Sequence, residues 1–156
     1  MPDMLVKLYE LPEKHELIRE LEEKEIQVRR GIGPEKHIVV EWVRKNFNPH
    51  WASECDIAFS RQPVSCFIAH RGQEILGFAC YDATYRNYFG PTGVTPDCRG
   101  QGIGKALLLA SLHGMAEQGY AYGIIGGAGP VEFYQKTLGA MVIEGADKGI
   151  YKGMLR

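Results

Sequence analysis

The segment from Gly93 to Ala106, GVTPDCRGQGIGKA, places glycines and basic residues where a short run of β-forming residues gives way to a long helical pattern. Glycine lets a backbone approach a ligand closely, and the first N–H groups of a helix have no partner within it. The helix dipole adds positive potential, which suits a phosphate or pyrophosphate. Arg99 and Lys105 bring positive charge to the same loop. The segment therefore predicts an anion-binding loop.

Two common phosphate motifs do not fit this loop. A P-loop requires glycine five residues before the Gly104–Lys105 pair and Ser or Thr after it, whereas positions 99 and 106 hold Arg and Ala. The dinucleotide fingerprint GxGxxG requires glycine at position 105, which is Lys. The pattern that fits is R-x-x-G-x-G, formed by Arg99, Gly102 and Gly104. A tight turn between a strand and a helix, with no ligand, is the alternative interpretation.

The elements that must position this loop follow from hydrophobic periodicity and from the Gly and Pro breaks. Alternating or short apolar runs predict strands over residues 5–11, 26–30, 64–69, 75–85, 88–94, 121–125, 140–144 and 149–154. Helical spacing predicts helices over residues 13–24, 34–46, about 51–59, 102–118 and a short one carrying Phe133, Tyr134 and Lys136. The order is βαβααβββαβαββ, which predicts one mixed α/β sheet in a single domain.

In these surroundings the loop resembles the acyl-CoA motif of the GNAT superfamily of N-acetyltransferases, which has Gln or Arg, two residues, Gly, one residue, then Gly or Ala. The resemblance covers about residues 26–154 and is strongest over 93–109. It implies a GNAT-type α/β (α+β) domain over 1–156, with a mostly antiparallel central sheet flanked by helices on both faces. Residues 1–25 would add a strand and a helix packed on the core.

The resemblance also implies acetyl-CoA as co-substrate, with no metal. The loop amides would hold the CoA pyrophosphate, and a β-bulge within Gly90–Gly93 would separate this strand from the next. The N–H of Val94 would then polarise the thioester carbonyl. The cofactor contacts so implied are Val94, Thr95, Arg99, Gly100, Gln101, Gly102, Ile103, Gly104 and Lys105.

The resemblance makes Tyr134 the catalytic residue, which would donate a hydrogen bond to the departing CoA sulfur. A tyrosine pKa near 10 and a thiol pKa near 8.5 make full proton transfer uphill by about 2 kcal/mol, so stabilising the thiolate is the expected role. The alternative is a core tyrosine, and Phe133 is expected to be core. Many relatives have Asn at the position of Gly127, and Ala140 stands in place of a usual Phe.

The nucleophile must be a neutral amine, because only that form carries a free lone pair. A lysine-like amine pays over 4 kcal/mol to lose its proton at pH 7, so it needs a base or a water chain. The strand 88–94 carries no acid. Asp82 and Glu54 are the nearest candidates, and either can be a solvated surface acid, so the base is left unassigned.

Composition excludes several other classes of protein. The 156 residues carry 18 Lys plus Arg and 19 Asp plus Glu. Because there is no excess of basic residues, we expect no nucleic-acid partner. No apolar run reaches the roughly 18 residues of a membrane span. The 4 cysteines lack zinc-ligand spacing and are expected to be reduced thiols of a cytoplasmic protein without a metal site.

The sequence thus predicts an N-acetyltransferase that moves acetyl from acetyl-CoA to a primary amine by direct attack. A small-molecule or peptide amine is the expected partner, and a homodimer is left open. The alternative is a catalytically silent acyl-CoA-binding regulatory module, which the missing Asn and the missing acid make reasonable. A longer acyl-CoA, or a plain binding domain without a CoA site, are further alternatives.

Overall fold

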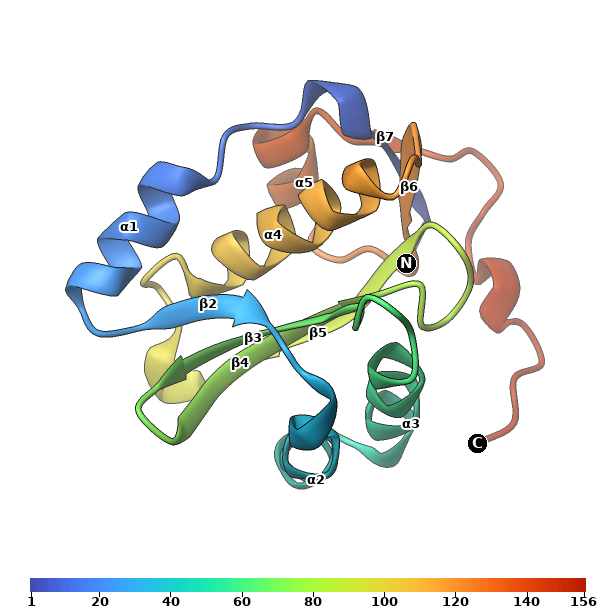
Figure 1. Cartoon of the computed structure of the whole chain (residues 1–156). Helices are drawn as coiled ribbons and strands as arrows, with labels where there is room; N and C mark the ends of the chain where they lie inside the picture. The colour runs from blue at the N-terminus through green and yellow to red at the C-terminus, as the bar shows by residue number, and fades with distance from the viewer.

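The computed structural model describes residues 1–156 and contains one sheet of seven strands (Figure 1). The strands are β1 (Met4–Lys7), β2 (Gln27–Arg30), β3 (Cys66–Arg71), β4 (Glu74–Tyr81), β5 (Tyr88–Val94), β6 (Tyr122–Ile125) and β7 (Met141–Val142). Their order in the sheet is β2-β3-β4-β5-β6-β1-β7. Every neighbouring pair is antiparallel except β5 and β6, which run parallel. The predicted mostly antiparallel sheet is therefore confirmed.

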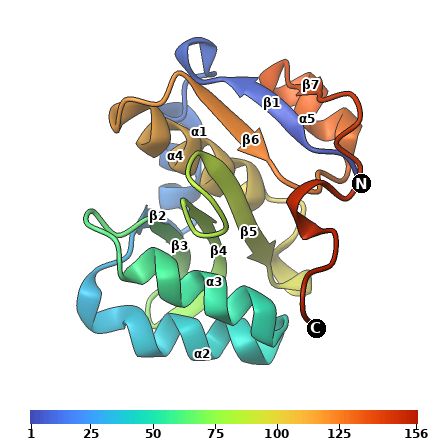
Figure 2. The same ribbon diagram turned by 90° about the vertical axis from the view of Figure 1, so that its right-hand side faces the viewer.

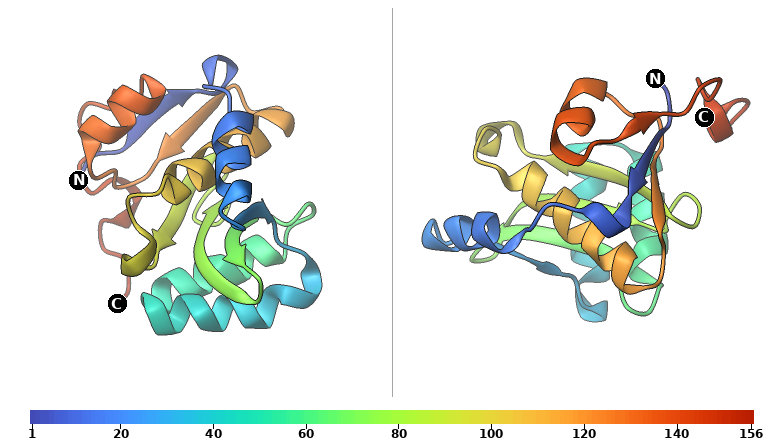
Figure 3. Two further views of the ribbon diagram at one scale, coloured as in Figure 1. Left: turned by 90° about the vertical axis from the view of Figure 1, so that its left-hand side faces the viewer. Right: turned by 90° about the horizontal axis from the view of Figure 1, so that it is seen from above.

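Helices cover both faces of this sheet, as predicted. They are α1 (His15–Glu23), α2 (Lys36–Asn46), α3 (Pro49–Phe59), α4 (Ile103–Glu117) and α5 (Val131–Leu138). Helices α1 and α4 lie on one face, and α2 and α3 lie on the opposite face (Figure 3). None of these helices has the length and apolar character needed to cross a lipid bilayer.

Two apolar cores fill the space between the sheet and the helices, one on each face. Helix α4 packs its Leu107, Leu112 and Met115 against one face of the sheet, and all three side chains are fully buried. Its Leu108 and Leu109 are buried as well. Because α4 is apolar on nearly all sides, it must be covered all round. Helix α4 therefore has a fixed position, and it anchors the glycine loop that leads into its N-terminus.

The second core lies between the sheet and the α2–α3 pair, where Val43 and Phe78 are fully buried. The side chain of Asn48 accepts a hydrogen bond from the N–H of Trp51 at 2.8 Å, which caps the start of α3. Pro49 occupies the first helical position, where its missing N–H costs nothing. The cap and Pro49 together fix where α3 begins.

The N-terminal segment forms the predicted extra strand and helix, β1 and α1, and β1 takes an interior place in the sheet. Strand β1 lies between β6 and β7, with Met4 opposite Ile125 and Lys7 opposite Tyr122. The side chains of Met4 and Val6 are completely buried. Strand β1 thereby pairs with the free edge of β6, an edge that would otherwise expose unpaired backbone groups.

Most predicted strands shift by a residue or two at their ends, β7 is shorter than predicted at Met141–Val142, and three predictions fail further. The strand predicted over 149–154 is wrong: residues 149–151 form a 3₁₀ turn, because Gly149 (φ 43°) and Gly153 (φ 77°) adopt left-handed backbone that breaks an extended run. The first strand ends at Lys7, where another 3₁₀ turn begins. Strand β4 ends at Tyr81, because Asp82 (φ 53°) starts the turn toward β5.

If β1 is integral to the core, Met4→Ala should lower the free energy of unfolding by about 2–5 kcal/mol, as expected for a large buried side chain cut to alanine. The neighbouring Leu5 faces the other way and is only half-buried, so Leu5→Ala is the matched control with a smaller expected loss. Urea denaturation followed by circular dichroism measures both. Equal stability of the wild type and Met4→Ala would contradict an interior position for β1.

Candidate active site

The glycine loop reaches α4 through two residues in left-handed backbone, Gly100 (φ 84°) and Gly102 (φ 89°). A side chain on Gly100 would meet open space. The backbone N–H groups from Gly100 to Lys105 have no acceptor within the protein, and Gly102 is the N-cap of α4. Arg99 and Lys105 are exposed beside them. Unpaired N–H groups, a helix N-terminus and two cations together fit an anionic group such as a pyrophosphate.

The residues predicted to contact the cofactor contribute in different ways. The side chain of Ile103 is 1% exposed and belongs to the core, so only its N–H faces the loop. The N–H of Thr95 is already used, because it donates to the carbonyl of Leu76 at 2.9 Å. Gln101 donates through Nε2 to the carbonyl of Cys98 at 3.4 Å. Arg99 donates through Nε to the carbonyl of Val94 at 3.3 Å, which holds the loop against the end of β5.

The predicted bulge lies at Gly90–Pro91. In the pairing of β4 with β5, Ala79 faces Thr92 and Tyr81 faces Phe89, so the β5 side contains one extra residue. Gly90 has φ 122°, which suits glycine at a bulge. The bulge bends β5 away from its other neighbour.

Strands β5 and β6 consequently pair over only two residues, Tyr88 with Ile124 and Phe89 with Ile125. Beyond Phe89 the two strands separate toward their C-terminal ends (Figure 2). The backbone of β5 past the bulge therefore has no strand on its β6 side. This is the separation that the sequence predicted.

The ladder between β4 and β5 determines which N–H groups point into this separation. Thr95 donates to Leu76, so the two form a hydrogen-bonded pair. Hydrogen-bonded and non-bonded pairs alternate along an antiparallel ladder, so the N–H of Gly93 points toward β4. The N–H groups of Thr92 and Val94 then point away from β4, toward β6. Both are oriented to meet a ligand lying between the strands.

A cavity of about 870 Å³ opens at this separation. Its walls come from the start of α3, the turn after β4, the bulge of β5, the loop after β6, helix α5 and both ends of the chain. The lining residues are Met1, Asn48, His50, Trp51, Ser53, Glu54, Thr84, Tyr85, Phe89, Gly90, Pro91, Thr92, Ile125, Gly126, Gly127, Ala128, Gly129, Tyr134, Ile150, Tyr151, Met154 and Arg156. Thr92 lines the cavity together with Tyr134, whereas Val94, predicted to face the thioester, does not.

Tyr134 is 8% exposed and contributes both to the core and to this cavity. Its hydroxyl makes no hydrogen bond to a protein group, and burial raises its pKa above the usual tyrosine value. The hydroxyl is therefore a neutral donor that is free to bind a group in the cavity. Phe133, predicted to be core, is 38% exposed, so that prediction is wrong; its ring packs edge-on against Tyr134 at 5.2 Å between centroids.

The structure distinguishes between Glu54 and Asp82, the two acids that the sequence left as candidates for the base. Glu54 lines the cavity and accepts a hydrogen bond from the hydroxyl of Thr84. Burial raises the pKa of Glu54 above that of an exposed glutamate. Asp82 lies outside the cavity: its Oδ1 accepts the N–H of Asn87 at 2.8 Å, and its Oδ2 accepts the hydroxyl of Tyr120 at 3.1 Å. Asp82 therefore holds the turn after β4, and Glu54 is the acid available for chemistry.

Sequence reasoning missed the wall formed by the C-terminal segment, residues 150–156. Tyr151 is half-buried, and its hydroxyl lies so close to Gly126 that a Cβ at that glycine would be 2.7 Å away. Burial raises the pKa of Tyr151. Met154 and Arg156 extend the same wall. No spacing signal marks such a contact, because the partners lie far apart along the chain.

Cys55, Cys66 and Cys80 lie together although their spacing in the sequence suggests no metal site. Their Sγ atoms are all within 4.8 Å of one another, and all three residues are buried. Burial raises the pKa of the Cys66 and Cys80 thiols. Three thiolates would suit a thiophilic metal. The surrounding side chains are apolar, however, and neutral cysteines pack well as small apolar residues in such a core.

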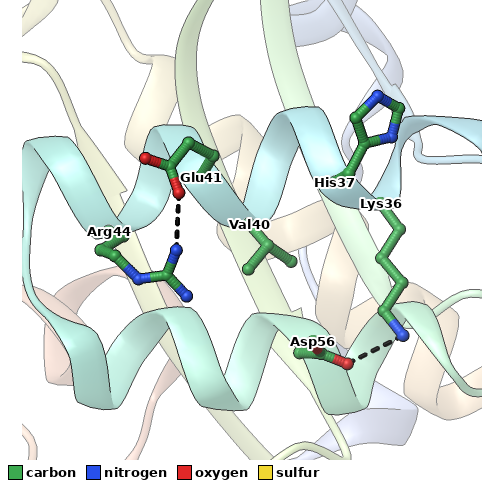
Figure 4. Close-up of a pocket in the computed structure, with 6 residues that line it drawn as sticks. All are labelled: Lys36, His37, Val40, Glu41, Arg44 and Asp56. Carbon is green, nitrogen blue, oxygen red and sulfur yellow. Dashed lines mark hydrogen bonds and ion pairs between the residues drawn. The ribbon is translucent and has the colours of Figure 1, made fainter.

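A second hollow of about 480 Å³ lies along α2 and α3, lined by Lys36, His37, Val40, Glu41, Arg44 and Asp56 (Figure 4). Lys36 pairs with Asp56 at 2.8 Å, and Arg44 pairs with Glu41 at 2.6 Å. Both cations are thus neutralised by acids beside them. This hollow has neither the unpaired N–H groups nor the free positive charge of the glycine loop.

The sequence matches the model of one protein family over most of its length. The model of the acetyltransferase (GNAT) family matches residues 35–140, which include the glycine loop, the bulge and Tyr134. No curated protein sequence matches the chain.

Several solved structures share the fold. The glucosamine N-acetyltransferase region of a fungal multi-domain GH3 β-N-acetylglucosaminidase has a TM-score of 0.73 and 13% identity, covering 91% of this chain and 19% of that chain. A GCN5-related N-acetyltransferase from Sphaerobacter thermophilus has a TM-score of 0.65 and 19% identity, covering 91% and 48%. A GNAT acetyltransferase from Brucella melitensis in complex with acetyl-CoA has a TM-score of 0.58 and 15% identity, covering 76% and 86%. This chain thus spans a small part of the first and about half of the second.

Proposed function

The chain belongs to the GNAT acetyltransferase family, and we propose that it transfers the acetyl group of acetyl-CoA to a primary amine by direct attack. One observation carries the proposal. The unpaired N–H groups of the glycine loop and the cavity that holds Tyr134 lie at the two ends of the same exposed stretch of β5. A pyrophosphate at the loop therefore allows the pantetheine arm to follow β5 and place the thioester in the cavity.

The β5 backbone is proposed to bind the arm and the thioester. We assign the N–H of Val94 to the pantetheine, because it points into the separation but lies outside the cavity. The N–H of Thr92 takes the role of oxyanion donor, since it points the same way and lines the cavity. A backbone donor held by the ladder stabilises the oxyanion without reorganising during the reaction.

The chemical step forms the bond between the amine nitrogen and the acetyl carbon and breaks the bond between that carbon and sulfur. The products are an N-acetyl amide and CoA. The incoming ammonium loses two protons: one passes through Glu54 to solvent before attack, and the other neutralises the CoA thiolate. Tyr134 donates its hydrogen bond to the sulfur as negative charge develops. Its raised pKa keeps it a donor and makes complete proton transfer less favourable.

The assignment of the glycine loop predicts a charge-specific effect at Gly102. Asn and Asp have nearly the same shape and tolerate the left-handed backbone at this position (φ 89°) best among side-chain-bearing residues. A Cβ there would be 3.0 Å from a terminal methyl of Leu17, which can shift. Gly102→Asp should therefore bind acetyl-CoA at least about 10-fold more weakly than Gly102→Asn, because its carboxylate faces the pyrophosphate. Isothermal titration measures the acetyl-CoA affinity of both variants. Equal affinities would show that the pyrophosphate does not bind at this loop.

The role of Tyr134 predicts that Tyr134→Phe lowers kcat by about 100-fold, the usual loss when one transition-state donor is removed. Acetyl-CoA affinity should be unchanged. The same experiment tests the silent regulatory module, for which Gly127 in the usual Asn position is the supporting observation. A protein that binds acetyl-CoA and acetylates no amine, with or without this substitution, would favour that module over the enzyme.

The role of Glu54 predicts a particular pH dependence. Because burial raises its pKa, kcat/KM should fall on the acidic side at a higher pH than a surface glutamate would give. His50, Tyr151 and Arg156 are the other titratable or charged side chains that line the cavity. Glu54→Gln, which can still accept the hydroxyl of Thr84, should remove this acidic limb and lower kcat/KM by about 100-fold. An unchanged pH profile in the variant would rule out Glu54 as the base.

Glu54→Gln also carries a stability control with a defined sign. A carboxyl whose folded pKa exceeds its unfolded pKa binds its proton more tightly in the folded state. Its ionised form therefore costs stability at neutral pH, and this cost disappears as pH falls below the unfolded pKa. Glu54→Gln should be at least as stable as the wild type at pH 7, so lost activity would not reflect unfolding.

A further inference from the structure

The acceptor end of the cavity is lined by aromatic rings. They come from α3, the turn after β4, strand β5, helix α5 and the C-terminal segment. These residues are Trp51, Tyr85, Phe89, Tyr134 and Tyr151. A ligand in this cavity can therefore pack against several aromatic side chains, which bind apolar groups well and attract cations to their faces.

The charges on the cavity wall are few. Among the side chains that line it, Glu54 is the one carboxylate, and Arg156 is the one with a permanent positive charge. His50 lies one helical turn before Glu54 on the same face of α3. One ammonium can pair with Glu54, but a second ammonium on the same molecule would find no other carboxylate side chain among the lining residues and would share the cavity with Arg156. The charge pattern thus favours an acceptor with a single amine.

Glu54 and the aromatic residues beside it form one recognition surface for that ammonium. Trp51 precedes Glu54 by three residues on α3, so the two side chains share a face of the helix. Thr84 holds the carboxylate from the other side, and Tyr85 follows it along the turn. An ammonium at Glu54 would have the rings of Trp51 and Tyr85 on the same cavity wall, where cation–π attraction can add to the ion pair.

The size of the cavity limits the rest of the acceptor. Its volume of about 870 Å³ must also hold the thioester end of acetyl-CoA. Pockets of roughly 300–1,000 Å³ typically bury small molecules. Tyr151 and Met154 close one side, with Tyr151 packed against the loop after β6. The space that remains for the acceptor is therefore small.

We propose that the acceptor is a small monoamine with an apolar or aromatic body, whose ammonium meets Glu54 and whose body packs against the wall that Tyr151 completes. The inference rests on the acetyl transfer proposed above. The amine nitrogen gains the acetyl carbon as the thioester bond to sulfur breaks, and CoA leaves with the proton from that nitrogen. Tyr151 is a specificity-determining residue, which contacts the acceptor body and no reacting atom.

The first test compares four acceptors with acetyl-CoA and the full chain: phenethylamine, ethylamine, spermidine and a short peptide whose only amine is a lysine side chain. Mass spectrometry measures each acetylated product. The value of kcat/KM for phenethylamine should exceed that for ethylamine by about 10- to 100-fold, as expected for burying one phenyl group. Spermidine and the peptide should also be poorer than phenethylamine. Preference for spermidine or for the peptide would overturn the inference and leave acetyl transfer standing.

The second test truncates side chains of the wall that residues 150–156 form. Tyr151→Ala should reduce the preference for phenethylamine over ethylamine by about 10-fold, chiefly through a higher KM for phenethylamine. Met154→Ala, a 40% exposed residue on the same wall, should act in the same direction and serves if Tyr151→Ala is unstable. Tyr9→Ala removes a 60% exposed tyrosine that packs on Tyr122, outside the cavity, and should change nothing. An unaltered preference in both wall variants would overturn the role of Tyr151.

A binding measurement separates the two proposals. Trp51 lines the cavity and Trp42 does not, so fluorescence of a Trp42→Phe variant reports on the cavity. In the presence of CoA, phenethylamine should quench this signal more strongly than spermidine. Quenching by phenethylamine without acetylation of any amine would overturn the transfer reaction and keep the ligand class. Acetylation that favours other amines would overturn the ligand class alone. The absence of both quenching and acetylation would overturn both proposals.

Discussion

The separation of β5 from β6 is the constraint on which the site depends. The bulge at Gly90–Pro91 bends β5 so that the two parallel strands pair only at Tyr88 and Phe89. A fully paired β5 would bury its N–H groups in the sheet, leaving no backbone for a ligand and no cavity beside Tyr134. The protein gives up ladder hydrogen bonds here, and the two fully packed cores on either side of the sheet supply the stability that permits this.

Gly93 links the position of β5 to that of Glu54 through packed aromatic rings. A Cβ on Gly93 would be 2.5 Å from the ring of Phe47, so the ring packs directly on the strand. Phe47 in turn stacks on Trp51 with 5.2 Å between centroids. Trp51 lies one turn before Glu54 on α3. A short run of packed contacts therefore connects β5, the strand proposed to bind the thioester, with Glu54, the proposed base, which explains how a half-buried carboxylate is held in place.

Local features of the sequence predicted the loop and the bulge, because their chemistry lies in adjacent residues such as Arg99, Gly102 and Gly90. The choice between Glu54 and Asp82 could not be predicted, since it depends on which wall each acid faces after the sheet assembles. Tyr151 could not be found for the same reason. Phe133 was assigned to the core from its type alone, whereas α5 lies at the surface and buries only the face that carries Tyr134.

The place of β1 explains why the C-terminal segment can form part of the cavity. A strand that leaves its edge free must pair with another segment or protect that edge. Because β1 pairs with β6 on one side and β7 on the other, residues after β7 are not needed to complete the sheet beside β6. Left-handed backbone at Gly149 and Gly153 keeps them out of extended structure. The chain is then free to pass beside the separated ends of β5 and β6 (Figure 2). There the hydroxyl of Tyr151 lies against Gly126, and both residues line the cavity.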